Sequence, residues 1–302
     1  MNLHKNHQEF YDAILMVSNK LNTSPSIVEK DYYVTMFLES LVKRVPNLLF
    51  KGGTSLSKCH KMINRFSEDI DLTLNAKNIT QSNKRQLKYE IIEVCKELGL
   101  ELINKEDILS RRDYNRYEIK YPIHFEETGI KQFILIETVF MVKSFPDEIK
   151  QVTSMIYEFW KEIGEVDIIE EYGMQPFKIH VQALERTLID KVFAICDYKI
   201  SDNVYGHSRH IYDLYKLLNV VTLDDKLKGL IKEVREERKK SEHCYSAKDE
   251  YNISELLKQI INEKTYYKDY EEITKRVLFE TIGYEEAITV LDKIIDSRVF
   301  EK

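Results

Sequence analysis

Two glycines and two aspartates form the pattern in this 302-residue sequence that is best suited to chemistry. Gly52 and Gly53 follow a short apolar run, and glycines let backbone N–H groups approach a triphosphate. Asp69 and Asp71 are two positions apart in an alternating polar–apolar segment, so both carboxylates should project from one face of a strand. Such carboxylates can share divalent ions, which activate an attacking hydroxyl and neutralise a leaving pyrophosphate. The pattern predicts nucleotidyl transfer with Mg²⁺ as cofactor, in a two-metal site.

A third carboxylate usually completes such a site, and Glu137 is the best candidate. It interrupts the apolar segment 133–142, where an unpaired charge would be costly. Simpler explanations remain open. The glycines can form an ordinary tight turn, and Glu137 can pair with a lysine or arginine. The two aspartates can belong to a solvated strand face or pair with Lys51 or Arg65.

Hydrophobic periodicity predicts the elements that hold these residues. Helices are expected over 26–45, 55–61 and 81–98, and strands over 48–50, 69–74, 117–125 and 131–142. Ser24 and Pro25 are suited to the start of the first helix, and the last two strands should be joined by a turn at 127–129. The first half therefore predicts a small mixed sheet flanked by helices.

The second half has a different character. Helical patterns cover 176–199, 208–218, 223–239, 253–262, 270–282 and 285–296. We therefore expect an α+β fold with a catalytic core over 1–147, including its N-terminal helices, and an α-helical C-terminal domain over 148–302.

Composition limits the classes of protein. Hydrophobic residues make up 43% and charged residues 32%, which is typical of an ordered globular chain and excludes disordered and collagen-like classes. The net charge of -6 means that any nucleic-acid surface must be local. The four cysteines form no C-x-x-C pair, which favours free thiols. Without a signal-peptide pattern or a run long enough to span a bilayer, we expect a cytoplasmic protein with no membrane partner.

Longer motifs resemble those of a known family. The strings KGGTSLSK at 51–58 and RFSEDIDL at 65–72 are similar to the signature of the AbiEii/AbiGii toxin family of nucleotidyltransferases, in the DNA polymerase β superfamily. Further resemblances are VEKDYYV at 28–34, LERTLIDKVFAI at 184–195 and SRHIYDLYKLL at 208–218. The resemblance runs over residues 24–218, and the rest of the C-terminal part is similar only in being helical.

The resemblance implies a polymerase β-like nucleotidyltransferase mixed sheet and a toxin of a kind that is usually paired with a cognate antitoxin protein. Such toxins transfer nucleotides from a nucleoside triphosphate (NTP), and some relatives modify the 3′ end of tRNA. The implied roles are phosphate binding for Gly52, Gly53, Thr54 and Ser55, metal binding for Asp69 and Asp71, and catalysis for Lys191 and Asp213 of the later motifs. Ser67, in the same string as the acids, is assigned to nucleotide binding. One departure is His210, where many relatives have an aspartate.

Lys191 also stands out from the residues alone, because it shares an apolar helix stripe with Leu184 and Ile195. It either extends to solvent or points into a cleft toward a phosphate, and in the second case its loss should lower activity but leave folding intact. Asp213 lies four residues after Arg209, so a surface ion pair explains it nearly as well as catalysis does.

Basic residues cluster near the predicted site. Lys58, Lys61 and Arg65 are expected to border the triphosphate, and Arg111, Arg112 and Arg116 to extend a basic surface toward RNA. His207, His210, His243 and Cys244 lack the spacing of a zinc site.

We therefore predict transfer of a nucleoside monophosphate from an NTP to an RNA acceptor, with a tRNA 3′ end as the leading acceptor, in a cleft between the two domains. One alternative is transfer to a protein hydroxyl. A second is a non-catalytic module that senses nucleotide or binds an antitoxin, which would not need the acid pair. The sequence does not identify the nucleobase, the acceptor or the oligomeric state.

Overall fold

The computed structural model describes residues 2–67, 69–76, 78–109, 112–127 and 130–301. Arg111 and residues 128 and 129 of the expected turn lie outside this part of the chain. The chain forms two compact units. Unit 1 consists of Met1–His60, Ser67–Phe140 and Asp147–Val181, and unit 2 of Lys61–Phe66, Met141–Pro146 and Gln182–Lys302.

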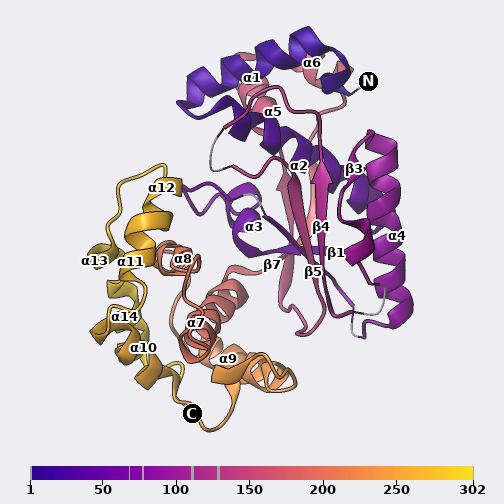
Figure 1. Ribbon diagram of the computed structural model, residues 1–302. Coiled ribbons are helices and arrows are strands. Elements are labelled where there is room, and N and C mark those ends of the chain that lie inside the picture. Colours follow the sequence, from indigo (N-terminus) through magenta and orange to yellow (C-terminus); the bar gives the residue numbers. More distant parts are fainter. Residues whose placement is uncertain (1, 68, 77, 110–111, 128–129, 302) are drawn as a thin grey trace. The chain divides into compact units, whose positions relative to one another are not determined.

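Unit 1 is built around a mixed sheet (Figure 1). Within the described residues this sheet has seven strands. The strands are β1 Leu48–Lys51, β2 Asp69–Leu74, β3 Glu101–Leu102, β4 Tyr114–Lys120, β5 Ile134–Val139, β6 Asp147–Val152 and β7 Phe177–Gln182. Their order is β3-β4-β5-β2-β1-β7-β6, so β2 is the central strand. It runs antiparallel to β1 and parallel to β5. The alternation of residues 69–74 therefore predicts β2 correctly, and the α+β fold class is confirmed.

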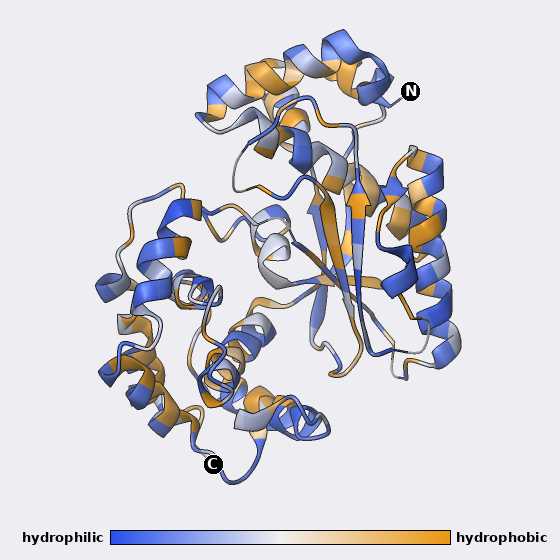
Figure 2. Ribbon diagram, in the orientation of Figure 1, coloured by the Kyte–Doolittle hydropathy of each residue, from blue (hydrophilic) through white to orange (hydrophobic). Residues whose placement is uncertain are grey.

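Helices of unit 1 pack against this sheet and against one another. They are α1 His7–Leu21, α2 Pro25–Arg44, α3 Gly52–Lys58, α4 Gln81–Leu98, α5 Met155–Ile163 and α6 Val166–Glu171. Helix α2 begins as predicted, since the Ser24 side chain accepts a hydrogen bond from the Ser26 amide and Pro25 occupies the first turn. Helix α4 carries both hydrophobic and hydrophilic residues, as expected for a helix with one buried face (Figure 2).

Unit 2 is mainly helical, as predicted for the C-terminal half. Its elements are α7 Leu184–Ile200, α8 Arg209–Leu217, α9 Asp225–Arg238, α10 Ile253–Asn262, α11 Tyr267–Asp269, a π-helical turn Tyr270–Thr274, α12 Lys275–Val277, α13 Tyr284–Ala287 and α14 Thr289–Ser297. Residues 61–66 also belong to this unit, where Arg65 and Leu278 form an antiparallel β-bridge. The RFSEDIDL string thus passes from unit 2 into unit 1.

The division between the units differs from the sequence prediction at residue 147. Strands β6 and β7 extend the sheet, and β7 pairs in parallel with β1 through Leu49–His180 and Phe50–Val181, so unit 1 continues to Val181. Residues 177–182 were expected to be helical but form β7. Their sequence FKIHVQ alternates apolar and polar residues, which is the period of a strand.

No helix in the described part of the chain is long and apolar enough to cross a membrane. Cys59, Cys95, Cys196 and Cys244 are all buried free thiols, as the sequence predicted.

Candidate functional site

Strand β2 carries the two aspartates into the middle of the sheet. Asp71 is in register with Glu137 of the parallel strand β5 and with Lys51 of the antiparallel strand β1. Residues in register on neighbouring strands project from the same face, so Glu137 lies beside Asp71, and Asp69 shares their face. We call the face defined by Asp69, Asp71 and Glu137 the acid face. The structure therefore brings the three predicted carboxylates onto one side of the sheet.

Two side chains that the sequence analysis did not select contact the acid face. The Lys131 ammonium donates a hydrogen bond to Asp69 Oδ1 at 2.9 Å, and the Tyr114 hydroxyl donates one to Glu137 Oε1 at 2.6 Å. Partial burial and the carboxylate of Glu137 both raise the pKa of Tyr114, so this phenol remains a donor at neutral pH. The only sequence signal for either residue is its place near a strand end, because the contacts depend on strand pairing.

Gly52 packs directly against the acid face. Its φ of +76° is a conformation that residues with a side chain rarely adopt. A Cβ atom at residue 52 would lie 2.7 Å from Asp71 Cγ and 3.1 Å from Asp71 Cβ, closer than ordinary van der Waals contact. The glycine motif and the acid motif are therefore parts of one local structure, in which backbone approaches carboxylate.

Hydroxyl groups beside the glycines form hydrogen bonds that stabilise the contact between the glycine motif and the acid motif. Thr54 Oγ1 lies 3.0 Å from Ser67 Oγ and also donates to the carbonyl of Asp69, while Ser55 Oγ donates to the Gly52 carbonyl at 2.9 Å. Thr54 and Ser55 are buried. These contacts hold the start of helix α3 against the start of strand β2, and phosphate binding by the hydroxyls stays a prediction.

Lys58 has a different environment from the one predicted. It is buried, its ammonium pairs with Asp31 of helix α2, and it donates to Thr35 Oγ1 at 2.7 Å. Asp31 also accepts a hydrogen bond from the Met155 amide at 2.7 Å. Lys58 was expected to border the triphosphate, but its charge is engaged inside unit 1, where it joins α3 to α2.

A second charged cluster lies inside unit 2. Asp213 of helix α8 is fully buried. Arg65 donates to its two oxygens at 2.7 and 2.8 Å, and Lys191 of helix α7 donates to Oδ2 at 2.5 Å. These contacts exclude two alternatives that the sequence left open, because buried Asp213 is not a surface partner of Arg209 and Lys191 does not extend to solvent. Arg65 pairs with Asp213, and its role in nucleotide binding stays a prediction.

The charges in this cluster depend on one another. Burial alone would raise the pKa of Asp213, but Arg65 and Lys191 hold the pKa well below its usual range. Burial lowers the pKa of Lys191, against the opposing effect of Asp213. His210 Nδ1 lies 3.3 Å from Lys191 Nζ. The pKa of His210 is well below its ordinary value, mainly because the ring is buried and also because of the positive charges of Lys191 and Arg209. His210, the departure noted in the sequence, thus supplies a neutral ring beside the ammonium.

Two of the three arginines expected to form a basic surface lie in the described part of the chain. Arg112 and Arg116 are exposed, whereas Arg111 lies outside the described residues. Arg116 is in register with Glu137 on strand β5, and its guanidinium pairs with Glu118 at 2.9 Å. This arginine therefore stands next to the acid face on the neighbouring strand.

Comparison with protein-family models matches residues 37–290 to the nucleotidyl transferase AbiEii toxin of type IV toxin–antitoxin (TA) systems. The chain belongs to this family. A search of curated proteins found no match. The AbiEii match confirms the resemblance seen in the sequence and the nucleotidyltransferase fold. The sequence motifs end at residue 218, whereas the family match continues to residue 290. A nucleotidyltransferase toxin has a nucleotide substrate and, in a TA system, an antitoxin partner.

The donor set of the acid face fits a magnesium ion. Mg²⁺ prefers oxygen ligands and is commonly held by one or two carboxylates together with water and substrate phosphates. Asp69 and Asp71 supply such a pair on one strand face. Within the described residues no group of three or more His, Cys, Asp or Glu side chains is arranged to hold a metal ion.

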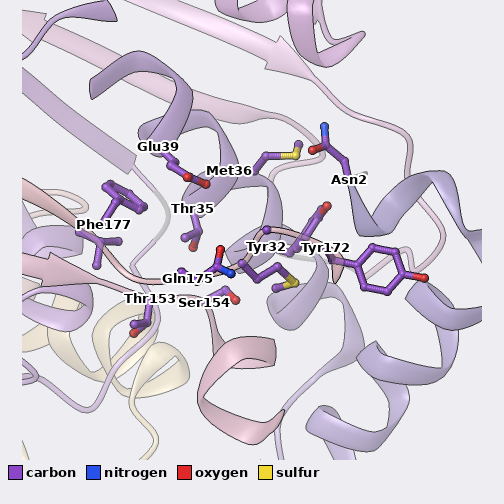
Figure 3. Close-up of a pocket in the computed structure, with 13 residues that line it drawn as sticks. Asn2, Tyr32, Thr35, Met36, Glu39, Thr153, Ser154, Tyr172, Gln175 and Phe177 are labelled. Atoms are coloured by element: carbon purple, nitrogen blue, oxygen red, sulfur yellow. The ribbon is translucent and has the colours of Figure 1, made fainter. Parts of the chain in front are cut away.

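A pocket in unit 1 lies at other residues. It is lined by Tyr32, Thr35, Glu39, Thr153, Tyr172 and Phe177, among others (Figure 3). The predicted site residues are absent from its lining, although Thr35 contacts Lys58. The pocket therefore belongs to the packing of helix α2 against the segment that follows β6 and does not coincide with the acid face.

Proposed function

We propose that this AbiEii-family nucleotidyltransferase transfers a nucleoside monophosphate from an NTP to a hydroxyl of RNA, with the 3′ end of tRNA as the leading acceptor. One observation carries the proposal. The register of β1, β2 and β5 gathers Asp69, Asp71 and Glu137 on one face, with the backbone of Gly52 packed against Asp71. Acidic side chains concentrated beside a glycine backbone suit a triphosphate that is bound together with a cation.

In this proposal Asp69 and Asp71 would hold Mg²⁺, and Glu137 lies beside them on the acid face as the candidate third carboxylate. The ion, when bound, neutralises charge on the phosphates and lowers the pKa of an attacking hydroxyl. The hydrogen bond from Tyr114 fixes one oxygen of Glu137, which orients its carboxylate relative to Asp71. The contacts among Thr54, Ser67 and the Asp69 carbonyl keep the first acid of the pair in place.

The exposed arginines support a nucleic-acid acceptor. Arg116 is next to Glu137 in the β4–β5 register. Arg112 is exposed and lies two positions before strand β4 begins. Cations beside a transferase site can bind the phosphates of an RNA strand even though the whole protein is acidic.

Lys191 and Asp213 enter this proposal with distinct roles. Their mutual contact and burial support a positioning role for Asp213, because its carboxylate is already held by Lys191 and Arg65. A phosphate-binding role for Lys191 stays a prediction from the family motif.

The decisive experiment supplies every acceptor at once. Purified protein is incubated with total RNA, protein extract and each α-labelled NTP in turn, with Mg²⁺ and with EDTA. The proposal expects Mg²⁺-dependent label in RNA, at the size of tRNA. Label in protein would establish protein nucleotidylylation instead, and label in neither would favour a non-catalytic module.

A further inference from the structure

The segment that leads into strand β5 is attached to two consecutive buried residues of helix α2. Glu29 is fully buried and accepts hydrogen bonds from the amides of His124 at 3.0 Å and Phe125 at 3.2 Å. The next residue, Lys30, is 1% exposed and donates to the carbonyl of Lys131 at 2.9 Å. Helix α2 therefore fixes the backbone of Lys131.

The side chain of Lys131 is less constrained than its backbone. Its ammonium lies 2.9 Å from Asp69 Oδ1, and the two side chains are 37% and 18% exposed. The lysine end of this ion pair is partly open to solvent, which screens the pair and limits the free energy that it contributes. The structure thus combines a fixed backbone with an ammonium that a competing cation can displace from its carboxylate.

We infer that Lys131 is a built-in counter-cation of the acid face, which neutralises Asp69 in the nucleotide-free protein and competes with a divalent cation for that carboxylate. This inference rests on the proposed function, in which Asp69 holds the metal ion. Three carboxylates on one face repel one another, and an ammonium beside Asp69 relieves part of that repulsion. A divalent ion carries more charge than the ammonium and displaces it, so Lys131 weakens binding of the metal ion at Asp69.

Titration of the apo protein with Mn²⁺ tests this competition, with free Mn²⁺ measured by its EPR signal and no nucleotide present. Lys131→Ala should bind Mn²⁺ roughly two- to fivefold more tightly than the wild type, because the ammonium no longer competes for Asp69. Lys131→Arg keeps the charge and pairs with a carboxylate through two donors, so its affinity should equal the wild type's or be lower.

Lys150→Ala is the matched control. Lys150 is also 37% exposed and pairs with Glu148 at 2.8 Å, but it lies on strand β6, away from the acid face in the strand order. It should leave Mn²⁺ binding unchanged, which separates local competition from a change in net charge. Adding Asp69→Asn should abolish the difference between Lys131→Ala and the wild type.

The outcomes are distinct. Equal or weaker Mn²⁺ binding by Lys131→Ala, in a protein whose melting temperature shows that it is folded, would overturn the competition while leaving metal binding at Asp69 intact. Wild-type Mn²⁺ binding that does not respond to Asp69→Asn would overturn the metal role of Asp69, and with it both proposals.

Discussion

The carboxylate of Asp71 occupies the space that a side chain on Gly52 would need. A Cβ atom at residue 52 would lie 2.7 Å from Asp71 Cγ, and the φ of Gly52 is +76°. Gly52→Ala should therefore cost about 2–5 kcal/mol of unfolding free energy, of which about 1–2 reflects the left-handed backbone and the rest the clash. Urea unfolding of the purified variant measures this.

Gly99→Ala is the control for the backbone contribution. Gly99 ends helix α4 with a φ of +68°, and a Cβ there would have nothing within 4 Å. It should cost only about 1–2 kcal/mol. In a double-mutant cycle, Asp71→Ala should recover part of the Gly52→Ala loss, and strictly additive effects would contradict the packing of Gly52 against Asp71.

The buried cluster of unit 2 predicts an order of stabilities. Asp213→Asn leaves Arg65 and Lys191 together without their buried counter-charge, so it should cost about 3–5 kcal/mol. Lys191→Met keeps the aliphatic stem and leaves Asp213 with Arg65, so it should cost less, about 1–3 kcal/mol. Thermal and urea unfolding of both variants give the order.

The apolar stripe around Lys191 suggests by itself that removing the charge leaves folding intact. The contact between Lys191 and Asp213 reverses that expectation. A Lys191→Met variant as stable as the wild type would contradict a structural role for the pair.

His210 predicts a pH dependence of stability. Its pKa in the folded protein is lowered, mainly by burial, so below about pH 6.5 the unfolded chain binds more protons than the folded one. Stability should fall as the pH drops from 6.5 toward 5, by at most about 1.4 kcal/mol per pH unit for this group. His4 contributes in the same direction, because burial lowers its pKa to about 4.

Replacing His210 isolates its share. Asn can still accept a hydrogen bond from Lys191 but cannot titrate, so His210→Asn should lose less stability between pH 7 and pH 5 than the wild type. The exposed His243→Asn serves as the control and should decline as the wild type does. Parallel curves for all three proteins would mean that His210 is not held neutral in the cluster.

Local patterns account for the parts of the fold that the sequence predicts well. The alternation of residues 69–74 predicts β2, and the range 81–98 predicts α4 as observed, where Thr80 and Asn83 form a capping box and Gly99 ends the helix. The helical expectation for residues 177–182 was wrong because β7 is a single short strand directly before the long helix α7. Its pairing with β1 brings together residues that are about 130 positions apart.

In the candidate site too, the sequence predicts local features but not the contacts between residues that are far apart in the chain. The residue types and spacing of Asp69 and Asp71 predict a shared strand face, and an acid within an apolar strand predicts Glu137. The partners of the basic residues depend on contacts far apart in sequence, such as Arg65 with Asp213 and Lys58 with Asp31. Sequence spacing alone therefore could not predict these two buried ion pairs, and a role of either cation in binding a triphosphate stays a prediction.

Transfer of α-labelled nucleotide to RNA by Asp71→Asn, compared with Asp147→Asn, tests the central claim most directly. Asp147 is also a strand aspartate, on β6, and pairs with His180 at 2.7 Å, so Asp147→Asn makes the same chemical change away from the acid face. Asp71→Asn should keep a stability close to the wild type's, because the loss of repulsion from Glu137 offsets the loss of attraction to Lys51. We predict that its transfer falls at least roughly a hundredfold while Asp147→Asn, once corrected for folded protein, transfers as the wild type does. Full transfer by folded Asp71→Asn would contradict the assignment of the acid face as the catalytic site.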